Sequence, residues 1–348
     1  MEGAATGAGG RSSGGGGALL AVVLVSSARG NADRRRACRN TWFKYAASED
    51  SPLPHTLRAR LLLRFLVAAD TSDAALASEA AAHGDVLSVE APEGYGHLWR
   101  KVLVALAGVE ARGLDYSYFV HADDDSLLRL DLLAPLLEAS PRDRFYWGYI
   151  WNADGPAEGG GGRTTAPIRN PRNKSHMPAE QYPLDFYPPF ASGCGFALSR
   201  DLVRALLARP LPDYRLLDPP FGIHLCGCER CVLREPVVPV HDGRVRPYRG
   251  IPIFHPSTLV QHYLRPEEMG PFYSQALQHA RHQREGGGDA AAAAGPAEAG
   301  GPAAGRSGGG GGGGGGGDGG VDGGTDAGGE DPAAQLYSQL VAMGLLRR

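Results

Sequence analysis

The sequence predicts an α/β protein with a central, mainly parallel twisted sheet and helices on both of its faces. Strand-like apolar runs alternate with helical stretches from Ala18 to Glu138, which is the order that βαβ units produce. The first run, Ala18–Val25, is entirely apolar and rich in valine, as expected of a strand buried on both faces. The formal net charge of the 348 residues is -3, and no long basic stripe is present. This charge balance does not support nucleic-acid binding.

The first strand is expected to lead into a helix and then a second strand. The helix is predicted over Arg34–Tyr45, and either Asn31 or Asp33 stands at a suitable position to cap it. The second strand is predicted over Leu61–Ala68, an apolar run of ordinary strand length. Together these elements form the first βαβ unit of the predicted sheet.

Two further helices and two further strands follow in alternation. Thr71–His83 is rich in alanine, a strong helix former, and Asp73 occupies a position typical of an N-cap. Asp85–Val89 is a short apolar run that we interpret as the third strand. Leu98–Ala111 has the apolar spacing of an amphipathic helix, and Tyr116–Val120 reads as the next buried strand.

The pattern changes after the next helix, which is predicted over Asp131–Glu138. Phe145–Trp151 is aromatic and strand-like. A last helix of this part is predicted over Leu202–Ala208, with Ser199 or Asp201 as its cap. We find no internal repeat in the chain.

Composition divides the chain into one folded domain and two flanking segments. Residues 1–17 are rich in Gly, Ala and Ser, and residues 284–332 are mostly Gly, Ala, Asp and Glu, so both are expected to be disordered. Residues 18–283 are predicted to fold as one domain, and residues 333–348 are predicted to form a short amphipathic helix. The run Ala18–Val25 is far shorter than the roughly 20 residues that a spanning helix needs, so no membrane anchor is expected within this chain.

Three consecutive carboxylates, Asp123, Asp124 and Asp125, follow the strand that reaches Val120. Adjacent like charges repel one another unless a cation neutralises them. Hard divalent ions such as Mg²⁺ and Mn²⁺ prefer oxygen ligands and are often held by carboxylates together with substrate phosphates. Ligands of open α/β sheets bind just past the carboxyl ends of strands. The cluster therefore indicates either a metal site that holds a diphosphate or a solvent-exposed turn.

Several segments, taken in order, resemble the β-1,3-galactosyltransferase family, Golgi enzymes that transfer sugars from UDP donors. The segments are ARGNADRRRACRNTW at Ala28–Trp42, GDVL at Gly84–Leu87, YGHLWRKV at Tyr95–Val102, HADDDSLLRL at His121–Leu130, YPPFASGCGFALSRDLV at Tyr187–Val203 and LVQHYLRPEEM at Leu259–Met269. Each segment is a weak signal alone, but the ordered set is specific. The likeness extends over Leu19–Phe272.

The resemblance implies a GT-A type fold with one nucleotide-sugar-binding domain. It also implies an inverting transfer of a hexose from a UDP-sugar to a hydroxyl of an acceptor glycan or glycoprotein, in β-1,3 linkage. Galactose is the first candidate for this hexose. Such a transfer needs one carboxylate base for the acceptor proton and a divalent metal to stabilise the departing UDP. The family further implies a Golgi location and membrane association, although no anchor is visible in this chain.

The resemblance also assigns roles to individual residues. Asp123, Asp125 and His262 are expected to bind Mn²⁺ or Mg²⁺, and Asp218 is expected to be the general base. Contacts with the diphosphate or uridine of the donor are expected from Arg35, Arg39, Lys101, Asp123 and Asp124, with Asp124 nearer the ribose or uracil.

Two departures from the family pattern leave the donor and the activity open. The family has Glu-Asp-Val where this chain has Leu217, Asp218 and Pro219, and it has Asn-Leu-Thr where this chain has His97, Leu98 and Trp99. The alternatives are an N-acetylglucosamine transferase and a catalytically inactive sugar-binding homologue. A metal-dependent phosphohydrolase is a further alternative, but it needs additional His/Asp motifs that we do not find.

Cysteine usage and one sequence triplet are compatible with a secretory lumen. The five cysteines are Cys38, Cys194, Cys226, Cys228 and Cys231. The last three are clustered but lack the second half of a zinc site, so disulfide pairing is the expected use, with the pairing left open. Asn173-Lys174-Ser175 is an acceptor triplet for N-glycosylation.

Overall fold

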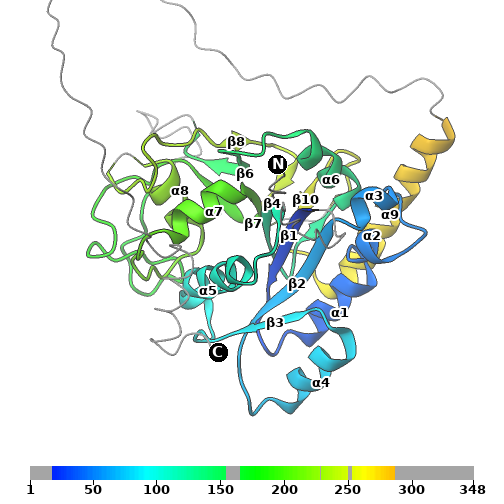
Figure 1. Ribbon diagram of the computed structural model, residues 1–348, viewed down its shortest axis with the longest axis horizontal. Helices are drawn as coiled ribbons and strands as arrows, with labels where there is room; N and C mark the ends of the chain where they lie inside the picture. Colours follow the sequence, from blue (N-terminus) through cyan, green and yellow to red (C-terminus); the bar gives the residue numbers. More distant parts are fainter. Residues whose placement is uncertain (1–17, 154–164, 228, 250–252, 287–348) are drawn as a thin grey trace, which may run out of the picture.

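The computed structural model describes residues 18–153, 165–227, 229–249 and 253–286 (Figure 1). The termini predicted to be disordered and the helix predicted over 333–348 lie outside these residues, apart from 284–286, which continue the last helix. Within the described part of the chain, no helix combines the length and the apolar character needed to cross a membrane.

Seven strands form the central sheet, in the order β3-β2-β1-β4-β7-β6-β8. They are β1 (Leu19–Ser26), β2 (Leu61–Ala68), β3 (Val86–Val89), β4 (Tyr116–Asp123), β6 (Tyr146–Trp151), β7 (Phe190–Ser199) and β8 (Val240–His241). Strands β1 to β4 are mutually parallel, β7 is antiparallel to both of its neighbours, and β6 pairs with β8 in parallel. The predicted α/β class with a mainly parallel sheet is confirmed and agrees with a GT-A type fold.

The order of the parallel strands determines where a ligand can bind. The chain runs outward from β1 to β2 and β3, and then returns to place β4 on the other side of β1. Neighbouring connections therefore diverge between β1 and β4, and open α/β sheets bind their ligands at the carboxyl ends of strands at such a switch point. Ser26 at the end of β1 pairs with Asp123 at the end of β4, so the acidic cluster lies at this switch point.

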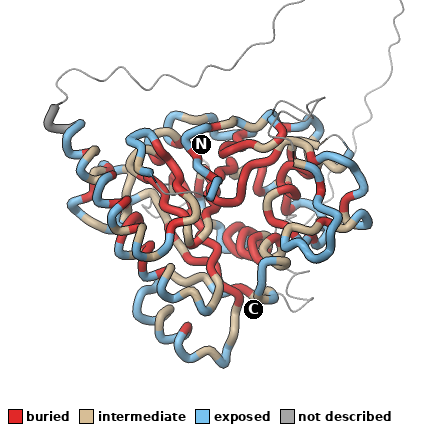
Figure 2. Tube along the Cα trace, turned by 180° about the vertical axis from the view of Figure 1, so that it is seen from behind, coloured by how far each residue is buried: buried red, intermediate tan, exposed pale blue. Residues whose placement is uncertain are grey.

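Helices cover both faces of the sheet (Figure 1). They are α1 (Ala32–Asn40), α2 (Lys44–Ala47), α3 (His55–Arg58), α4 (Ala74–His83), α5 (Leu98–Ala111), α6 (Leu130–Ala139), α7 (Arg200–Leu207), α8 (Asp218–Leu225) and α9 (Pro266–Gly286), with a 3₁₀ turn at Tyr95–His97. Alternate residues of β1 feed two separate cores, as the pleat of a strand requires. Val23 and Val25 pack with α1, α6 and α9, whereas Val22 and Leu24 pack with α5, α7 and α8. Figure 2 shows the resulting buried interior.

The helix predicted over Arg34–Tyr45 is interrupted, and this part of the prediction was wrong. Helix α1 ends at Asn40, and a separate short helix, α2, begins at Lys44. At the break, the hydroxyl of Thr41 donates a hydrogen bond to the carbonyl of Ala37 at 2.6 Å, an alternative to continued helical bonding. The turn places Trp42, which is fully buried, in the core. Core packing thus outweighs the local helical preference.

The predicted caps differ in how they act. The side chain of Asp73 accepts a hydrogen bond from the backbone N–H of Leu76 at 2.9 Å, so the predicted cap of α4 is confirmed. Asn31 and Ser199 occupy the N-cap positions of α1 and α7 but make no capping hydrogen bond. Ser199 instead donates to the carboxylate of Asp201 at 2.5 Å.

A second, three-stranded sheet lies beside the switch point. It consists of β5 (Leu127–Leu128), β10 (Val260–Gln261) and β9 (Val245–Arg246), with β10 in the middle. Strand β10 is antiparallel to β5 and parallel to β9. Because β5 follows the acidic cluster directly, this pairing draws a distant part of the chain toward it.

Candidate functional site

The acidic cluster forms a turn that leaves the sheet at the end of β4. Asp123 is the last residue of that strand, and its carbonyl accepts a hydrogen bond from the N–H of Ser126 at 3.0 Å. The N–H of Asp124 donates to the carbonyl of Ser26 at 3.2 Å, which holds the turn against the end of β1. Strand β4 is three residues longer than predicted, because β1 pairs with it as far as Asp123.

The pairing of β5 with β10 brings His262 to this turn. Val260 lies opposite Leu128 in the antiparallel ladder, and His262 follows β10 directly. The N–H of Leu264 also donates to the carbonyl of Asp125 at 2.9 Å. Gly195 of β7 permits the close approach of β10, since a Cβ atom there would overlap the side chain of Val260. Residues 137 positions apart in the sequence (262 minus 125) therefore share one turn.

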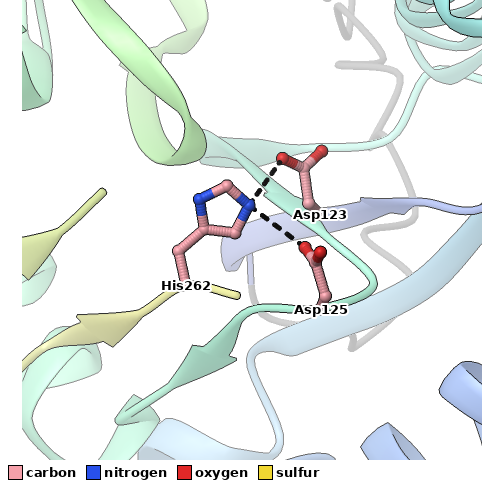
Figure 3. Close-up of side chains that lie close together, drawn as sticks. All are labelled: Asp123, Asp125 and His262. Carbon is pink, nitrogen blue, oxygen red and sulfur yellow. Dashed lines mark ion pairs between the residues drawn. The ribbon is translucent and has the colours of Figure 1, made fainter. Parts of the chain in front are cut away.

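Asp123, Asp125 and His262 converge on one point (Figure 3). The Nε2 atom of His262 lies 3.1 Å from Oδ1 of Asp125 and 3.6 Å from Oδ2 of Asp123. One potential ligand atom from each of the three side chains lies within 4.8 Å of the other two. The structure thus brings together the three residues that the sequence analysis assigned to a metal, and their role as ligands remains a prediction.

The surroundings of Asp123 and His262 shift the pKa of each group from its ordinary value. Burial raises the pKa of Asp123 to about 8, although His262 acts in the opposite direction. Burial would lower the pKa of His262, but its hydrogen bond to Asp125 and its interactions with Cys194 and Asp123 raise that pKa to about 11. His262 and the two carboxylates are therefore electrostatically coupled. Two carboxylate oxygens and one imidazole nitrogen form a donor set that suits Mn²⁺, and also Mg²⁺ with added water or phosphate ligands.

Asp124 has different surroundings from its two neighbours. Its buried carboxylate accepts hydrogen bonds from the hydroxyl of Ser27 at 2.7 Å and from the side-chain amide of Asn31 at 2.8 Å. These donors belong to the loop that connects β1 with α1. Asp124 therefore ties the acidic turn to that loop, and its predicted contact with the ribose or uracil remains a prediction.

Arg34 belongs to the cluster, although the sequence analysis did not single it out. Its guanidinium lies 3.1 Å from the carboxylate of Asp124 and 3.0 Å from that of Asp125. The side chain is 40% exposed, so it forms one wall of the site with a face open to solvent. Nothing in the run of three arginines distinguishes it from exposed Arg36, because only the direction of α1 decides which side chain faces the turn.

Arg35 and Arg39 are bonded to protein carboxylates. Arg35 is almost fully buried and donates to Glu79 at 2.6 and 2.8 Å. Arg39 donates to Asp85 at 2.7 and 2.8 Å and also pairs with Glu79. Both line a pocket of about 760 Å³ between α1 and α4, whose lining does not include the acidic cluster. Their predicted contact with the donor remains a prediction, and these ion pairs give them a clear structural use.

Lys101 lies closer to the switch point. Its ammonium group is buried and donates to the carbonyl of Ser27 at 3.0 Å. Burial lowers the pKa of Lys101, while Glu93, Asp124 and Asp123 act in the opposite direction. This position under the loop after β1 is compatible with the predicted contact with the donor, which remains a prediction.

Asp218 opens helix α8 and is held by the backbone of β7. The N–H of Gly193 donates to Oδ2 of Asp218 at 2.8 Å. A Cβ atom at position 193 would overlap Oδ1 of the same carboxylate, so only glycine allows this approach. Burial raises the pKa of Asp218 to about 6, although the Gly193 N–H lowers it. The charge of Asp218 also contributes to the raised pKa of Asp123, so the two carboxylates are electrostatically coupled.

A pocket of about 220 Å³ lies beside Asp218. Its walls are mainly apolar and aromatic and come from segments that are distant in the sequence: Tyr95, Thr165, Ala166, Ile168, Ser175, Tyr187, Phe190, Leu216, Leu217, Asp218 and Pro219. The hydroxyl of Tyr187 is buried and has no hydrogen-bond partner among the described residues. The pocket therefore combines one carboxylate with apolar and aromatic walls, a combination that suits a small polar ligand with apolar faces.

The remaining cysteine and glycosylation predictions have partial outcomes. Within the described residues, Cys38, Cys194, Cys226 and Cys231 are all free, and Cys228 lies outside that part of the chain. No disulfide is therefore seen among these four cysteines. Asn173 is exposed, and its side-chain oxygen accepts a hydrogen bond from the N–H of Ser175 at 2.8 Å.

Comparison with known proteins gives consistent matches. The Galactosyltransferase family model matches residues 33–211. The chain is 35% identical over 186 residues to beta-1,3-galactosyltransferase 6 of Mus musculus, covering 52% of each protein. It is 28% identical over 208 residues to beta-1,3-galactosyltransferase 5 of Pan paniscus, covering 58% of this chain and 62% of that protein. It is 29% identical over 188 residues to beta-1,3-galactosyltransferase GALT1 of Arabidopsis thaliana, covering 52% of this chain and 26% of that protein.

These matches cover only part of each relative. The aligned region spans 62% or less of the length of all three proteins. The range matched by the family model, 33–211, contains the acidic turn and Gly193 but ends before Asp218 and His262. The match to the family model therefore does not extend to Asp218 and His262, and the geometry of these two residues is a separate line of support for their predicted roles.

Proposed function

Because the chain belongs to the galactosyltransferase family, we propose that it transfers a hexose from a UDP-sugar to a hydroxyl of an acceptor glycan, forming a β-1,3 linkage with inversion. Galactose is the proposed hexose, since the relatives described above are named β-1,3-galactosyltransferases. A glycan or glycoprotein in the Golgi lumen is the proposed acceptor, which fits the usual location of such enzymes.

One observation supports the proposal most directly: two separate sets of side chains lie near one switch point. Asp123, Asp125 and His262 form one set, and Asp218, held by Gly193, forms the other. An inverting displacement needs this separation, because the base acts on the acceptor while the metal acts on the departing diphosphate.

The first set would hold Mn²⁺ or Mg²⁺ together with the diphosphate of the donor. Asp123 and Asp125 would each offer a carboxylate oxygen, and His262 would offer its Nε2 atom. A bound divalent ion would stabilise the negative charge that develops on UDP. Arg34, which already bridges Asp124 and Asp125, would add positive charge at the same edge of the sheet.

The second set would act on the acceptor. Asp218 would accept the proton of the attacking hydroxyl, and its raised pKa makes the carboxylate a stronger base than an exposed aspartate. The neighbouring pocket would hold the acceptor sugar, with aromatic rings against its apolar faces. Leu217 and Pro219, the departures from the family pattern, line this pocket and leave the contact between Gly193 and Asp218 in place.

The proposal is tested by assaying purified protein for UDP release and product formation. UDP-galactose, UDP-N-acetylglucosamine and UDP-glucose are each supplied with Mn²⁺, with and without a panel of acceptor glycans. We expect acceptor-dependent release from UDP-galactose and a β-1,3-linked product by NMR. Preference for UDP-N-acetylglucosamine would instead identify the alternative transferase. An absence of release from every donor, with donor binding retained, would identify an inactive sugar-binding homologue.

The raised pKa of Asp218 predicts an acidic limb in the pH profile. The base works only as a carboxylate, so the active fraction falls as the pH drops through about 6. At saturating donor and metal, turnover at pH 5 should be roughly tenfold below its plateau. Binding of Mn²⁺-UDP is measured at each pH, so that loss of metal is not mistaken for protonation of the base. Constant turnover between pH 5 and 7 would contradict this assignment.

A further inference from the structure

We propose that His121 is a positioning residue for Asp218 and acts through the backbone of Gly193. The proposal rests on the proposed role of Asp218 as the base. His121 does not reach the pocket or the acidic cluster as a reacting group, since its side chain is fully buried on β4. Its two ring nitrogens instead connect the end of β1 with the segment of β7 that holds the carboxylate of Asp218.

The hydrogen bonds of His121 have a defined direction. Its Nδ1 atom lies 2.8 Å from the carbonyl oxygen of Gly193, and its Nε2 atom lies 2.9 Å from the hydroxyl of Ser26. A carbonyl oxygen can only accept, so Nδ1 carries the hydrogen in this contact. The Ser26 hydroxyl can serve as either partner, so it adapts to the imidazole without changing the contact with Gly193.

Gly193 needs such an external restraint for two reasons. It must be glycine because Asp218 occupies the space of a Cβ atom, and glycine has the least restricted backbone of all residues. It also lies in an irregular part of the sheet. The ladder between β4 and β7 ends at the pair of Ala122 and Gly195, and the ladder between β6 and β7 is interrupted opposite this segment, between Gly148 and Ile150.

The bond from His121 fixes the orientation that Gly193 presents to Asp218. The carbonyl of Gly193 accepts from His121, and the N–H of the same residue donates to Asp218 at 2.8 Å. Rotation of either adjoining peptide would break one of these bonds and move the other. The chain of contacts therefore runs from Ser26 through His121 and Gly193 to Asp218.

Two conservative substitutions separate the two ring nitrogens. The amide nitrogen of asparagine reproduces the position of Nδ1, so His121→Asn can keep the bond to Gly193. Glutamine reproduces the position of Nε2, so His121→Gln keeps the contact with Ser26 and loses the bond to Gly193. His121→Phe removes both contacts but keeps a ring that can stack on Phe196, as His121 does with a centroid distance of 5.2 Å.

The experiment measures turnover, Mn²⁺-UDP affinity and amide hydrogen exchange at Gly193 in the full chain. We expect His121→Gln and His121→Phe to lose about tenfold in turnover with unchanged Mn²⁺-UDP affinity, because a displaced base misses the acceptor proton. Exchange at Gly193 should become faster by a similar factor in both variants. His121→Asn should stay close to the parent in both measurements. Val120→Ala removes two methyl groups from the core on the opposite face of β4, so it serves as the control for lost stability.

The outcomes distinguish this proposal from the proposed function. Exchange at Gly193 reports its bond to Asp218 whether or not the protein is active. Faster exchange in His121→Gln but not in His121→Asn would support the positioning role, even if the parent protein released no UDP and the proposed transfer had failed. Equal exchange and equal turnover in all three variants, or losses that merely follow thermal stability as in Val120→Ala, would overturn the positioning role and leave the proposed transfer intact.

Discussion

Replacement of Asp218 by asparagine is expected to lower turnover by about 10²–10⁴-fold, the usual value of positioned general-base catalysis. Asparagine has nearly the same shape and keeps an oxygen that can accept the Gly193 N–H, which in the parent lies 2.8 Å from Oδ2. It lacks the basicity that the burial of Asp218 increases. Affinity for Mn²⁺-UDP should therefore stay near that of the parent while kcat falls.

The matched control is Asp213→Asn. Asp213 lies five residues before Asp218 in the sequence, is 43% exposed and pairs with Arg100 at the surface. Its replacement removes the same charge without touching the pocket, so turnover should be retained. If Asp218→Asn turned over like the parent, Asp218 would not be the base. If the parent itself transferred no sugar from any donor, Leu217 and Pro219 would be the first residues to restore to the family pattern.

Replacement of Asp125 by asparagine is expected to abolish metal-dependent binding of the UDP-sugar. Loss of groups that merely orient metal ligands typically costs about 10–100-fold in metal affinity, so loss of a proposed ligand should cost more than about 100-fold. Asp125 has the closer of the two contacts between His262 and a proposed carboxylate ligand, at 3.1 Å. Its replacement therefore removes both a ligand oxygen and the group that orients the imidazole.

The structure predicts a different effect of Asp125→Asn on thermal stability than the sequence does. From the sequence, removal of one of three like charges should only relieve repulsion. In the folded protein Asp125 pairs with Arg34 and with His262, so the substitution also removes two ion pairs. We expect a modest loss of thermal stability that leaves the fold intact, because Arg34 is partly exposed and retains Asp124.

Calorimetric titration of Mn²⁺ and UDP into the variant measures this effect. Asp242→Asn is the matched control, since Asp242 is a buried carboxylate that pairs with Arg244 and accepts a hydrogen bond from Trp147, and neither partner belongs to the cluster. It should lose stability and keep its affinity for Mn²⁺-UDP. Unchanged affinity in Asp125→Asn would refute the assignment of the ligands. Chelation of the metal from the parent should reproduce the binding defect, and added Mn²⁺ should reverse it.

Local sequence patterns were sufficient for most of the alternating strands and helices from β1 to α6, whereas β7, α8 and α9 were not predicted. β2 and α5 begin and end at the predicted residues, and the predicted cap of α4 at Asp73 is present. Strand propensity and helix periodicity both depend on residues that are close together in the sequence, so they can be recognised from the sequence alone. The break at Thr41 was missed, because the gain from burying Trp42 comes from residues on other elements.

The residues of the candidate site also fall into those that local sequence revealed and those that it did not. Asp123, Asp124 and Asp125 were recognised as a group because they stand together after a strand, whereas Asp218 and His262 entered only through the family resemblance. The sequence around the three aspartates does not show that Asp124 and Asp125 have different partners. Asp124 faces donors from the loop after β1, while Asp125 faces His262, because successive side chains of the turn point in different directions.

The sequence by itself determined the α/β class, the family and the position of the acidic turn at the end of a buried strand. Only the tertiary structure decided which distant groups meet there. The pairing of β5 with β10 places His262 beside Asp125, and the irregular part of β7 places Gly193 between His121 and Asp218. The physical reason is that these contacts join residues far apart in the chain through sheet pairing and close backbone approach, and neither leaves a periodic signal in the sequence.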